Sequence, residues 1–145
     1  KNAEILAIDV SEEAIKVAKK NIKDKYLDNQ IKLKNATFDT INQKFDLIVS
    51  NPPYLSKKEL ESISTEIRNF EPAVALAGGE DGLNFYREFS KKIANKMKNS
   101  GYLIFEMGAN QYKDCKEIFS HSCLKFKKKS QDLQKKDRIM VFSKL

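Results

Sequence analysis

The chain alternates between short apolar runs and longer stretches in which apolar residues recur at helical spacing. Short apolar runs bounded by polar residues are typical of buried strands. We expect strands at residues 5–9, 31–33, 45–50, 102–106, 124–126 and 139–142, and helices at residues 11–26, 83–97 and 111–119. This alternation predicts one α/β domain with a mostly parallel sheet. No helix separates the last two strands, so we expect an antiparallel pair at the end of the sheet.

Several polar features interrupt this pattern or follow the ends of strands. The third strand stops at Asn51-Pro52-Pro53-Tyr54, because proline cannot donate a hydrogen bond to a strand ladder. Residues 55–70 predict a short helix, and residues 71–82, with a proline and three glycines, predict a loop. In open α/β sheets ligands bind beyond the carboxyl ends of strands, where Asp9 and the proline segment lie. Glu106 also ends a strand, and we interpret it as structural.

The composition and net charge limit the classes of protein to which the chain can belong. The 145 residues include 27 Lys and Arg against 20 Asp and Glu, which gives a net charge of +7. We interpret the lysine-rich excess as a solvated surface and leave an acidic or nucleic-acid partner open. No apolar run approaches the ~20 residues of a membrane span, and residues 1–4 show no signal-peptide pattern, so we expect a cytoplasmic protein. Cys115 and Cys123 lack metal-binding spacing, so no metal site is expected.

Asp9 ends the first strand just before a helix. A carboxylate in this position can accept hydrogen bonds from both ribose hydroxyls of a nucleotide. The same acid can instead help to cap the helix that Ser11 begins. Position alone leaves both roles open.

The segment Asn51-Pro52-Pro53-Tyr54 is the sharpest chemical signal in the chain. Its prolines fix the backbone and remove N–H groups, so carbonyl oxygens stay available as acceptors. The Asn51 side-chain oxygen and the Pro52 carbonyl present two acceptors to one planar NH₂ group. Tyr54 offers a flat face to the planar group that carries this nitrogen. We therefore interpret the segment as an acceptor-binding loop, in preference to a rigid turn alone.

The same segment is similar to the N-P-P-Y signature of S-adenosylmethionine-dependent methyltransferases that modify planar nitrogens. The residues beyond it resemble those of one subgroup, the HemK/PrmC family of release factor glutamine N5-methyltransferases. The resembling segments are Arg68–Pro72, Ala75–Leu83, Tyr86-Arg87 and Asp132–Arg138. The resemblance covers essentially the whole chain. It implies a Rossmann-like class I methyltransferase that uses S-adenosyl-L-methionine to methylate a glutamine side-chain nitrogen in a peptide-chain release factor.

The resemblance also implies which residues bind the acceptor. Asn51 and Pro52 match the residues that accept hydrogen bonds from the reacting NH₂ group, so they are the expected catalytic residues. Pro53 and Tyr54 complete the substrate-binding loop. Hydrogen bonds from both N–H groups would concentrate electron density on an otherwise poorly nucleophilic amide nitrogen, so transfer would depend on orientation and electrostatics.

Three residues are implied to bind the cofactor. Asp9 matches the family's ribose-binding acid, and Asn51 also lies beside the methionine part of the cofactor. Residues 35–38 align with an adenine-side motif, in which Thr37 is the expected contact. Ala36 and Thr37 depart from the residues usual in that motif, so we expect weak adenine contacts there.

The largest departure from the family lies before Asp9. A glycine-rich cofactor loop is expected about 20 residues upstream, but only eight residues precede Asp9 and none is glycine. We therefore expect residues 1–145 to be one partial catalytic domain that lacks this loop and the family's first strand. That strand would lie between the strand ending at Asp9 and the strand ending at Ser50.

Two other functions remain open. A nucleic-acid adenine-N6 methyltransferase would use the same loop for a flipped adenine, and the positive charge favours this function slightly. The Gly78–Leu83 block speaks against it. A non-catalytic remnant of the methyltransferase fold would account for the absent glycines, but it would not account for the intact segment Asn51–Tyr54.

Overall fold

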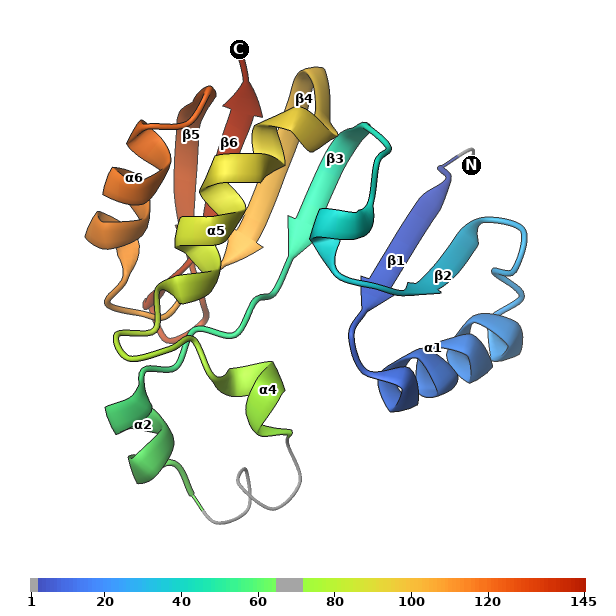
Figure 1. The fold of residues 1–145 in the computed structure, drawn as a ribbon, viewed down its shortest axis with the longest axis horizontal. Coiled ribbons are helices and arrows are strands. Elements are labelled where there is room, and N and C mark those ends of the chain that lie inside the picture. The colour runs from blue at the N-terminus through green and yellow to red at the C-terminus, as the bar shows by residue number, and fades with distance from the viewer. Residues whose placement is uncertain (1–2, 65–71) are drawn as a thin grey trace. The chain divides into compact units, whose positions relative to one another are not determined.

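The computed structural model describes residues 3–64 and 72–145, and the chain divides into two compact units, residues 1–43 and 44–145. The first unit is a β-α-β arrangement (Figure 1). Strand β1 (Ile5–Asp9) and strand β2 (Ile31–Asn35) are joined by helix α1 (Glu12–Asp24) and pair in parallel. A short 3₁₀ helix, η1 (Phe38–Thr40), follows β2. This parallel pair agrees with the mostly parallel sheet that the sequence predicts.

Helix α1 begins where the sequence predicts. The Ser11 hydroxyl accepts a hydrogen bond from the backbone N–H of Ala14 at 3.1 Å, and two glutamates occupy the first turn. The helix ends at Asp24, close to the end expected at about residue 26. Tyr26 has a φ of 56°, a left-handed conformation that interrupts the helical path of the chain.

The second unit is built on a four-stranded sheet with the strand order β3-β4-β6-β5. Its strands are β3 (Phe45–Ser50), β4 (Met97–Glu106), β5 (Leu124–Gln131) and β6 (Asp137–Lys144). Strand β4 runs parallel to β3, whereas β6 runs antiparallel to both β4 and β5. The antiparallel pair predicted for the last two strands is therefore confirmed. Both of these strands are longer than expected, because only residues 132–136 form the turn between them.

The helices of this unit differ in part from the sequence prediction. Helix α2 (Lys57–Ser62) confirms the short helix expected within residues 55–70, and helix α6 (Tyr112–Ser120) lies close to its expected position. Helix α4 (Ala73–Leu76) is one turn in a stretch that was expected to be loop. Its residues favour a helix, and Pro72 is well suited to begin one.

Helix α5 (Asn84–Lys92) and the 3₁₀ helix η2 (Ile93–Lys96) end sooner than expected. The prediction that the helix reaches residue 97 is wrong because Met97 begins β4 and lies opposite Phe45 of β3. Strand pairing replaces helical hydrogen bonds here. The helical spacing of apolar residues within 83–97 predicts one buried face, and all five of its residues are buried: Leu83, Tyr86, Phe89, Ile93 and Met97.

The core of the second unit lies between the sheet and helices α5 and α6, which cover one face of it (Figure 1). Aromatic rings fill this layer. Phe105 of β4 packs against Phe119 of α6 at a ring-centroid distance of 4.9 Å and against Phe142 of β6 at 5.8 Å. Such rings bury large apolar areas, so the packing fixes β4 firmly below the helices. This packing holds the backbone at the carboxyl end of β4 in place.

One strand in each unit, β1 in the first and β3 in the second, lies at an edge of its sheet. Within the described residues β1 pairs only with β2, and β3 pairs only with β4. These are the two strands that the family resemblance places on either side of a further strand. Each therefore presents one unpaired edge of backbone N–H and C=O groups within its own sheet.

Candidate functional site

The proline segment directly follows the carboxyl end of β3. Asn51 is exposed, and no side-chain hydrogen bond to a described residue holds its carboxamide. Pro52 is buried, whereas Pro53 and Tyr54 are half-buried. The prolines make this exit from the sheet rigid, because their rings fix φ. The Asn51 amide oxygen, which no described residue holds by a side-chain hydrogen bond, thus lies on a stiff segment beyond the carboxyl end of β3.

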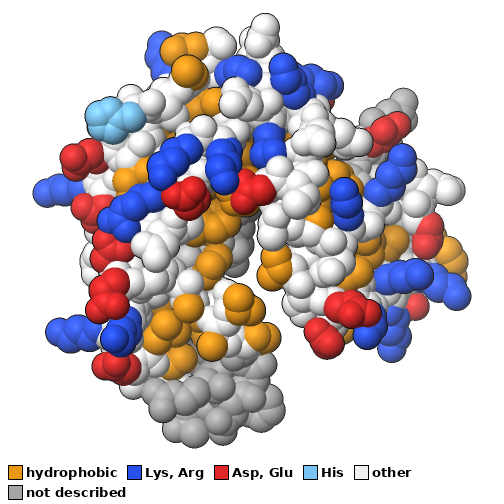
Figure 2. All heavy atoms as spheres, viewed as in Figure 1, with side chains coloured by type: hydrophobic (Ala, Val, Ile, Leu, Met, Phe, Trp, Pro, Cys, Tyr) orange, Lys and Arg blue, Asp and Glu red, His pale blue; other side chains and the backbone are white. Residues whose placement is uncertain are grey.

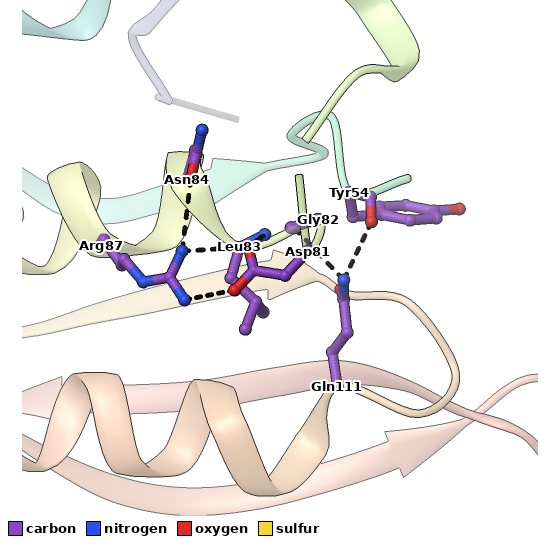
Figure 3. Close-up of polar contacts among 7 residues, drawn as sticks. All are labelled: Tyr54, Asp81, Gly82, Leu83, Asn84, Arg87 and Gln111. Atoms are coloured by element: carbon purple, nitrogen blue, oxygen red, sulfur yellow. Dashed lines mark hydrogen bonds and ion pairs between the residues drawn. The ribbon is translucent and has the colours of Figure 1, made fainter. Parts of the chain in front are cut away.

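The backbone of Tyr54 is fixed by a residue that the sequence did not single out. The side-chain nitrogen of Gln111, just before α6, donates to the Tyr54 carbonyl at 2.9 Å and to the Gly82 carbonyl at 3.2 Å (Figure 3). Its side-chain oxygen accepts from the backbone N–H of Gly108 at 2.9 Å. One amide therefore ties together three chain segments that are distant in sequence. No spacing or composition signal distinguishes this glutamine from others in the sequence.

The glycine-rich block that carries the family resemblance continues this support. Leu55 donates to the carbonyl of Leu76 at 2.9 Å, and the N–H of Gly78 donates to the carbonyl of Leu55 at 2.8 Å. Gly82 has a φ of +79°, and a Cβ atom there would lie only 2.4 Å from the Tyr54 carbonyl oxygen. Both the conformation and the close approach favour glycine at this position. The block thus acts as a cradle for residues 54–57.

An ion pair between Asp81 and Arg87 stabilises the glycine-rich block. The Arg87 guanidinium forms a two-pronged ion pair with the Asp81 carboxylate, and the N–H of Leu83 donates to the same carboxylate at 3.1 Å (Figure 3). The hydrogen bond from Arg87 lowers the pKa of Asp81 to about 2. The carboxylate therefore stays charged through the neutral range and holds the turn into α5.

The hydroxyl end of Tyr54 meets a carboxylate at the end of β4. It donates to the side-chain oxygen of Glu106 at 3.0 Å, and the hydroxyl of Tyr86 donates to the backbone carbonyl of Glu106 at 3.0 Å. Burial, followed by the bond to Glu106, raises the pKa of Tyr54. Burial also raises the pKa of Tyr86. Both hydroxyls therefore remain protonated donors at neutral pH.

Two of the three expected cofactor residues, Asp9 and Thr37, belong to the first unit, whereas Asn51 belongs to the second. Asp9 and Asn35 lie opposite each other at the carboxyl ends of β1 and β2. The Asn35 amide donates to the carbonyls of Asp9 and Val10 at 3.0 and 2.9 Å, which closes this end of the pair. Exposed Thr37 lies just beyond and makes no side-chain bond to the 3₁₀ helix after it.

One oxygen of Asp9 caps the turn before α1. It accepts from the N–H of Ser11 at 2.8 Å, which satisfies the capping alternative considered from the sequence. The second oxygen has no hydrogen bond to a described residue, and the carboxyl group is exposed. Asp9 can therefore cap the turn and still accept a ribose hydroxyl, since a carboxylate accepts several hydrogen bonds.

Other sequence expectations concern features outside these sites. Residues 68–71, part of the segment that resembles the glutamine methyltransferases, lie outside the described residues. Cys115 is buried and Cys123 is exposed. Across residues 3–64 and 72–145, no cluster of three metal-binding side chains occurs, and no helix is long and apolar enough to cross a membrane. On the face shown in Figure 2, basic side chains are interspersed with acidic ones.

The fold defines the class of protein. A methyltransferase from Pyrococcus furiosus superposes with a TM-score of 0.69 at 17% identity, covering 97% of this chain and 62% of that one. The chain therefore has the Rossmann-like fold of class I methyltransferases, as the sequence predicts. It belongs to the methyltransferase small domain family, whose model matches residues 1–80. Membership of this family implies S-adenosyl-L-methionine as the methyl donor.

Relatives with a more specific name match almost the whole chain. The release factor glutamine methyltransferase of Fusobacterium nucleatum is 38% identical over 146 residues, which cover 99% of this chain and 41% of the relative. The protein of the same name from Clostridium acetobutylicum is 31% identical over 147 residues, which cover 97% of this chain and 51% of the relative. The chain thus spans about half the length of these curated relatives.

Proposed function

We propose that the protein transfers a methyl group from S-adenosyl-L-methionine to the side-chain amide nitrogen of a glutamine in a peptide-chain release factor. The observation that carries this proposal is the similarity to proteins named release factor glutamine methyltransferase, at 31% and 38% identity over nearly the whole chain. Residues 51–54, whose Tyr54 is held by Gln111 and Glu106, supply oxygen acceptors suited to an amide NH₂ group, which agrees with that similarity. The proposed partner is the release factor, so the reaction would modify the machinery that terminates translation in the cytoplasm.

Asn51 and Pro52 are the proposed catalytic residues. An amide nitrogen is a weak nucleophile because its lone pair is delocalised into the carbonyl. The Asn51 side-chain oxygen and the Pro52 carbonyl would accept hydrogen bonds from both N–H groups, which directs electron density toward the incoming methyl group. Pro53 keeps this geometry rigid, and the half-buried ring of Tyr54 bounds the acceptor amide.

The residues present fit the cofactor that the family implies. When bound, S-adenosyl-L-methionine supplies an activated methyl group on a sulfonium. We propose that Asp9 accepts hydrogen bonds from its ribose through the oxygen left free by the Ser11 turn. Thr37 is the proposed contact on the adenine side, and Asn51 the proposed contact to the methionine part. The open carboxylate at the end of β1 is the feature that supports this fit.

We further propose that residues 1–145 belong to one catalytic domain, even though the two units are separately compact. The match of the Pyrococcus furiosus structure to 97% of the chain supports a common fold for both.

The glycine-rich block that contacts the loop after Tyr54 favours the glutamine reaction over adenine methylation, because it belongs to the stretch that resembles the glutamine enzymes.

The chemical class of the acceptor tests the proposal. The full-length protein is incubated with cofactor labelled in its methyl group and, in separate reactions, with a release factor, adenine-containing DNA and adenine-containing RNA. We expect the label on a glutamine of the release factor, and no label when that glutamine is replaced by alanine. Label in nucleic acid but not in protein would establish the adenine-N6 reaction instead. No transfer to any acceptor, with cofactor bound, would favour a non-catalytic role.

A further inference from the structure

We propose that Glu106 is a positioning residue for the methyl acceptor, and that it acts by fixing the ring of Tyr54. This inference rests on the proposed function, because it assigns the ring to the wall of the acceptor site. The sequence placed Glu106 at the end of a strand and suggested a structural role. The structure adds a direct contact, since its carboxylate accepts the Tyr54 hydroxyl at 3.0 Å.

Glu106 is anchored to the most rigid part of the second unit. It is the last residue of β4, an inner strand that pairs with β3 on one side and β6 on the other. Its backbone carbonyl accepts the Tyr86 hydroxyl, and the next N–H, that of Met107, donates to the Arg138 carbonyl at 2.8 Å. Phe105 and Met107 on either side of it are buried. The carboxylate therefore projects from a backbone with little freedom to move.

Tyr54 is consequently held at both ends. Gln111 fixes its carbonyl, and Glu106 fixes its hydroxyl, from two different elements of the unit. In Figure 3 the ring of Tyr54 extends away from Gln111, so the glutamine alone does not restrain the far end of the side chain. A tyrosine ring has two side-chain torsions, and its hydroxyl oxygen lies on the axis of the second, so a bond at the hydroxyl restrains mainly the first, which sets the direction of the ring. Hydrogen bonds to an ionised acceptor are about twice as strong as neutral ones.

This arrangement has a consequence for the reaction. The acceptor loop needs its two oxygen acceptors and its flat wall at fixed positions, since a small displacement of reacting groups slows transfer strongly. The prolines fix the backbone of the loop, but they leave the Tyr54 side chain free to rotate. The bond to Glu106 restrains the direction in which this side chain points. The role of Glu106 is therefore distinct from that of Asn51, which would contact the reacting nitrogen directly.

The test uses four variants of the full-length enzyme: Glu106→Leu, Glu106→Gln, Tyr54→Phe and the double variant Tyr54→Phe/Glu106→Leu. Glu117→Leu, which removes an exposed carboxylate from α6, is the matched control. Steady-state kcat and KM are measured for the release factor and for the cofactor. We expect Glu106→Leu to raise the KM for the release factor or lower kcat, with a combined loss of about tenfold. The KM for the cofactor should stay unchanged.

The double variant and the glutamine variant separate positioning from a general effect on folding. If Glu106 acts through the Tyr54 hydroxyl, the double variant should lose no more activity than the worse single variant. Glu106→Gln keeps an oxygen acceptor and should recover to within about threefold of the natural enzyme. Multiplicative losses in the double variant, or natural kinetics in Glu106→Leu, would overturn the proposal.

A spectroscopic measurement tests the contact without the reaction. Residues 1–145 contain five tyrosines and no tryptophan, so a difference in near-ultraviolet circular dichroism between variants of this segment reports mainly on tyrosine packing. Glu106→Leu should change this signal in the natural background and leave it unchanged in the Tyr54→Phe background. If the natural enzyme methylates no release factor, the proposed function fails. If it does so but the spectral change persists without the Tyr54 hydroxyl, the positioning role fails by itself.

Discussion

The two units of the chain differ sharply in how much they bury. In residues 44–145 the sheet and helices α5 and α6 enclose fully buried aromatic rings, such as Phe105 and Phe119. In residues 1–43, helix α1 has no buried residue, and β1 is at most half-buried along its length. Burial of apolar surface is the main stabilising contribution to a fold. The second unit is therefore the better stabilised of the two.

The proposed roles divide along the same boundary. The acceptor loop and its supports, Gln111 and Glu106, all belong to the well-packed unit, whereas Asp9 and Thr37 belong to the thinly packed one. A loop that must present two acceptors in a fixed geometry benefits from a rigid base. The comparison teaches that tertiary contacts support the proposed acceptor loop, whereas Asp9, a proposed cofactor residue, is held by strand pairing and a short-range turn.

The largest difference is expected from a matched pair of isoleucine truncations. Ile93 is 1% exposed in the second unit, whereas Ile15 of α1 is only half-buried. Ile93→Ala should reduce the opening free energy of β4 amides by about 2–5 kcal/mol, because it leaves a cavity in a packed core. Ile15→Ala should have less than half that effect on β1. Native-state hydrogen exchange measures both, and equal effects would contradict the comparison.

A smaller effect is expected from a methyl group added in the cradle. Gly82→Ala combines a left-handed backbone with a clash against the Tyr54 carbonyl, so it should destabilise the second unit by about 1–3 kcal/mol. It should also raise the KM for the release factor. Gly101→Ala is the control, since its added carbon meets backbone oxygens of residues 45, 46 and 98 at the other end of β3, so it should affect stability without raising the KM. Chemical denaturation and kinetics of both variants test this, and a harmless Gly82→Ala would mean that the cradle does not hold the loop.

The smallest effect concerns acid stability. The pKa of Asp81 is lowered to about 2, below its ordinary value of 3.8, mainly by the hydrogen bond from Arg87. A lowered pKa in the folded state contributes stability above pH 4 that is lost as the pH falls through 2. The pair is partly exposed, so we expect about 0.2–1 kcal/mol. Stability measured as the pH falls from 6 should show Arg87→Ala less stable at pH 6, with the difference shrinking toward pH 2 and vanishing below it; a constant difference would exclude the mechanism.

Much of the fold could be predicted because local patterns carry it. The apolar runs located every strand, and the Ser11 cap located the start of α1. The spacing of Leu83 to Met97 identified a buried face correctly, although Met97 itself lies in a strand. The error arose because pairing with Phe45, a residue distant in sequence, decides the local structure there. Local pattern cannot reveal such pairing.

The proposed acceptor residues could also be identified from the sequence. The residues that hold them in place could not. Asn51 to Tyr54 form a contiguous segment with unusual chemistry for a strand end. Gln111 and Glu106 reach Tyr54 across 57 and 52 positions in the sequence, through single hydrogen bonds. An isolated glutamine or glutamate carries no signal of such a contact. The roles assigned to Asp9, Thr37 and Asn51 to Tyr54 stay predictions.

The most direct measurement compares Asn51→Ala with Asp9→Ala in the full-length enzyme, by calorimetric titration of S-adenosyl-L-methionine and by methyl transfer to a release factor in the same samples. Asn51→Ala should reduce transfer by about 10²-fold or more, because a contact to the reacting nitrogen is lost, while the Kd of the cofactor, which has other proposed contacts, changes far less than transfer does. Asp9→Ala should weaken cofactor binding by about tenfold and regain transfer at saturating cofactor. Near-natural turnover in Asn51→Ala would contradict the acceptor role of the loop.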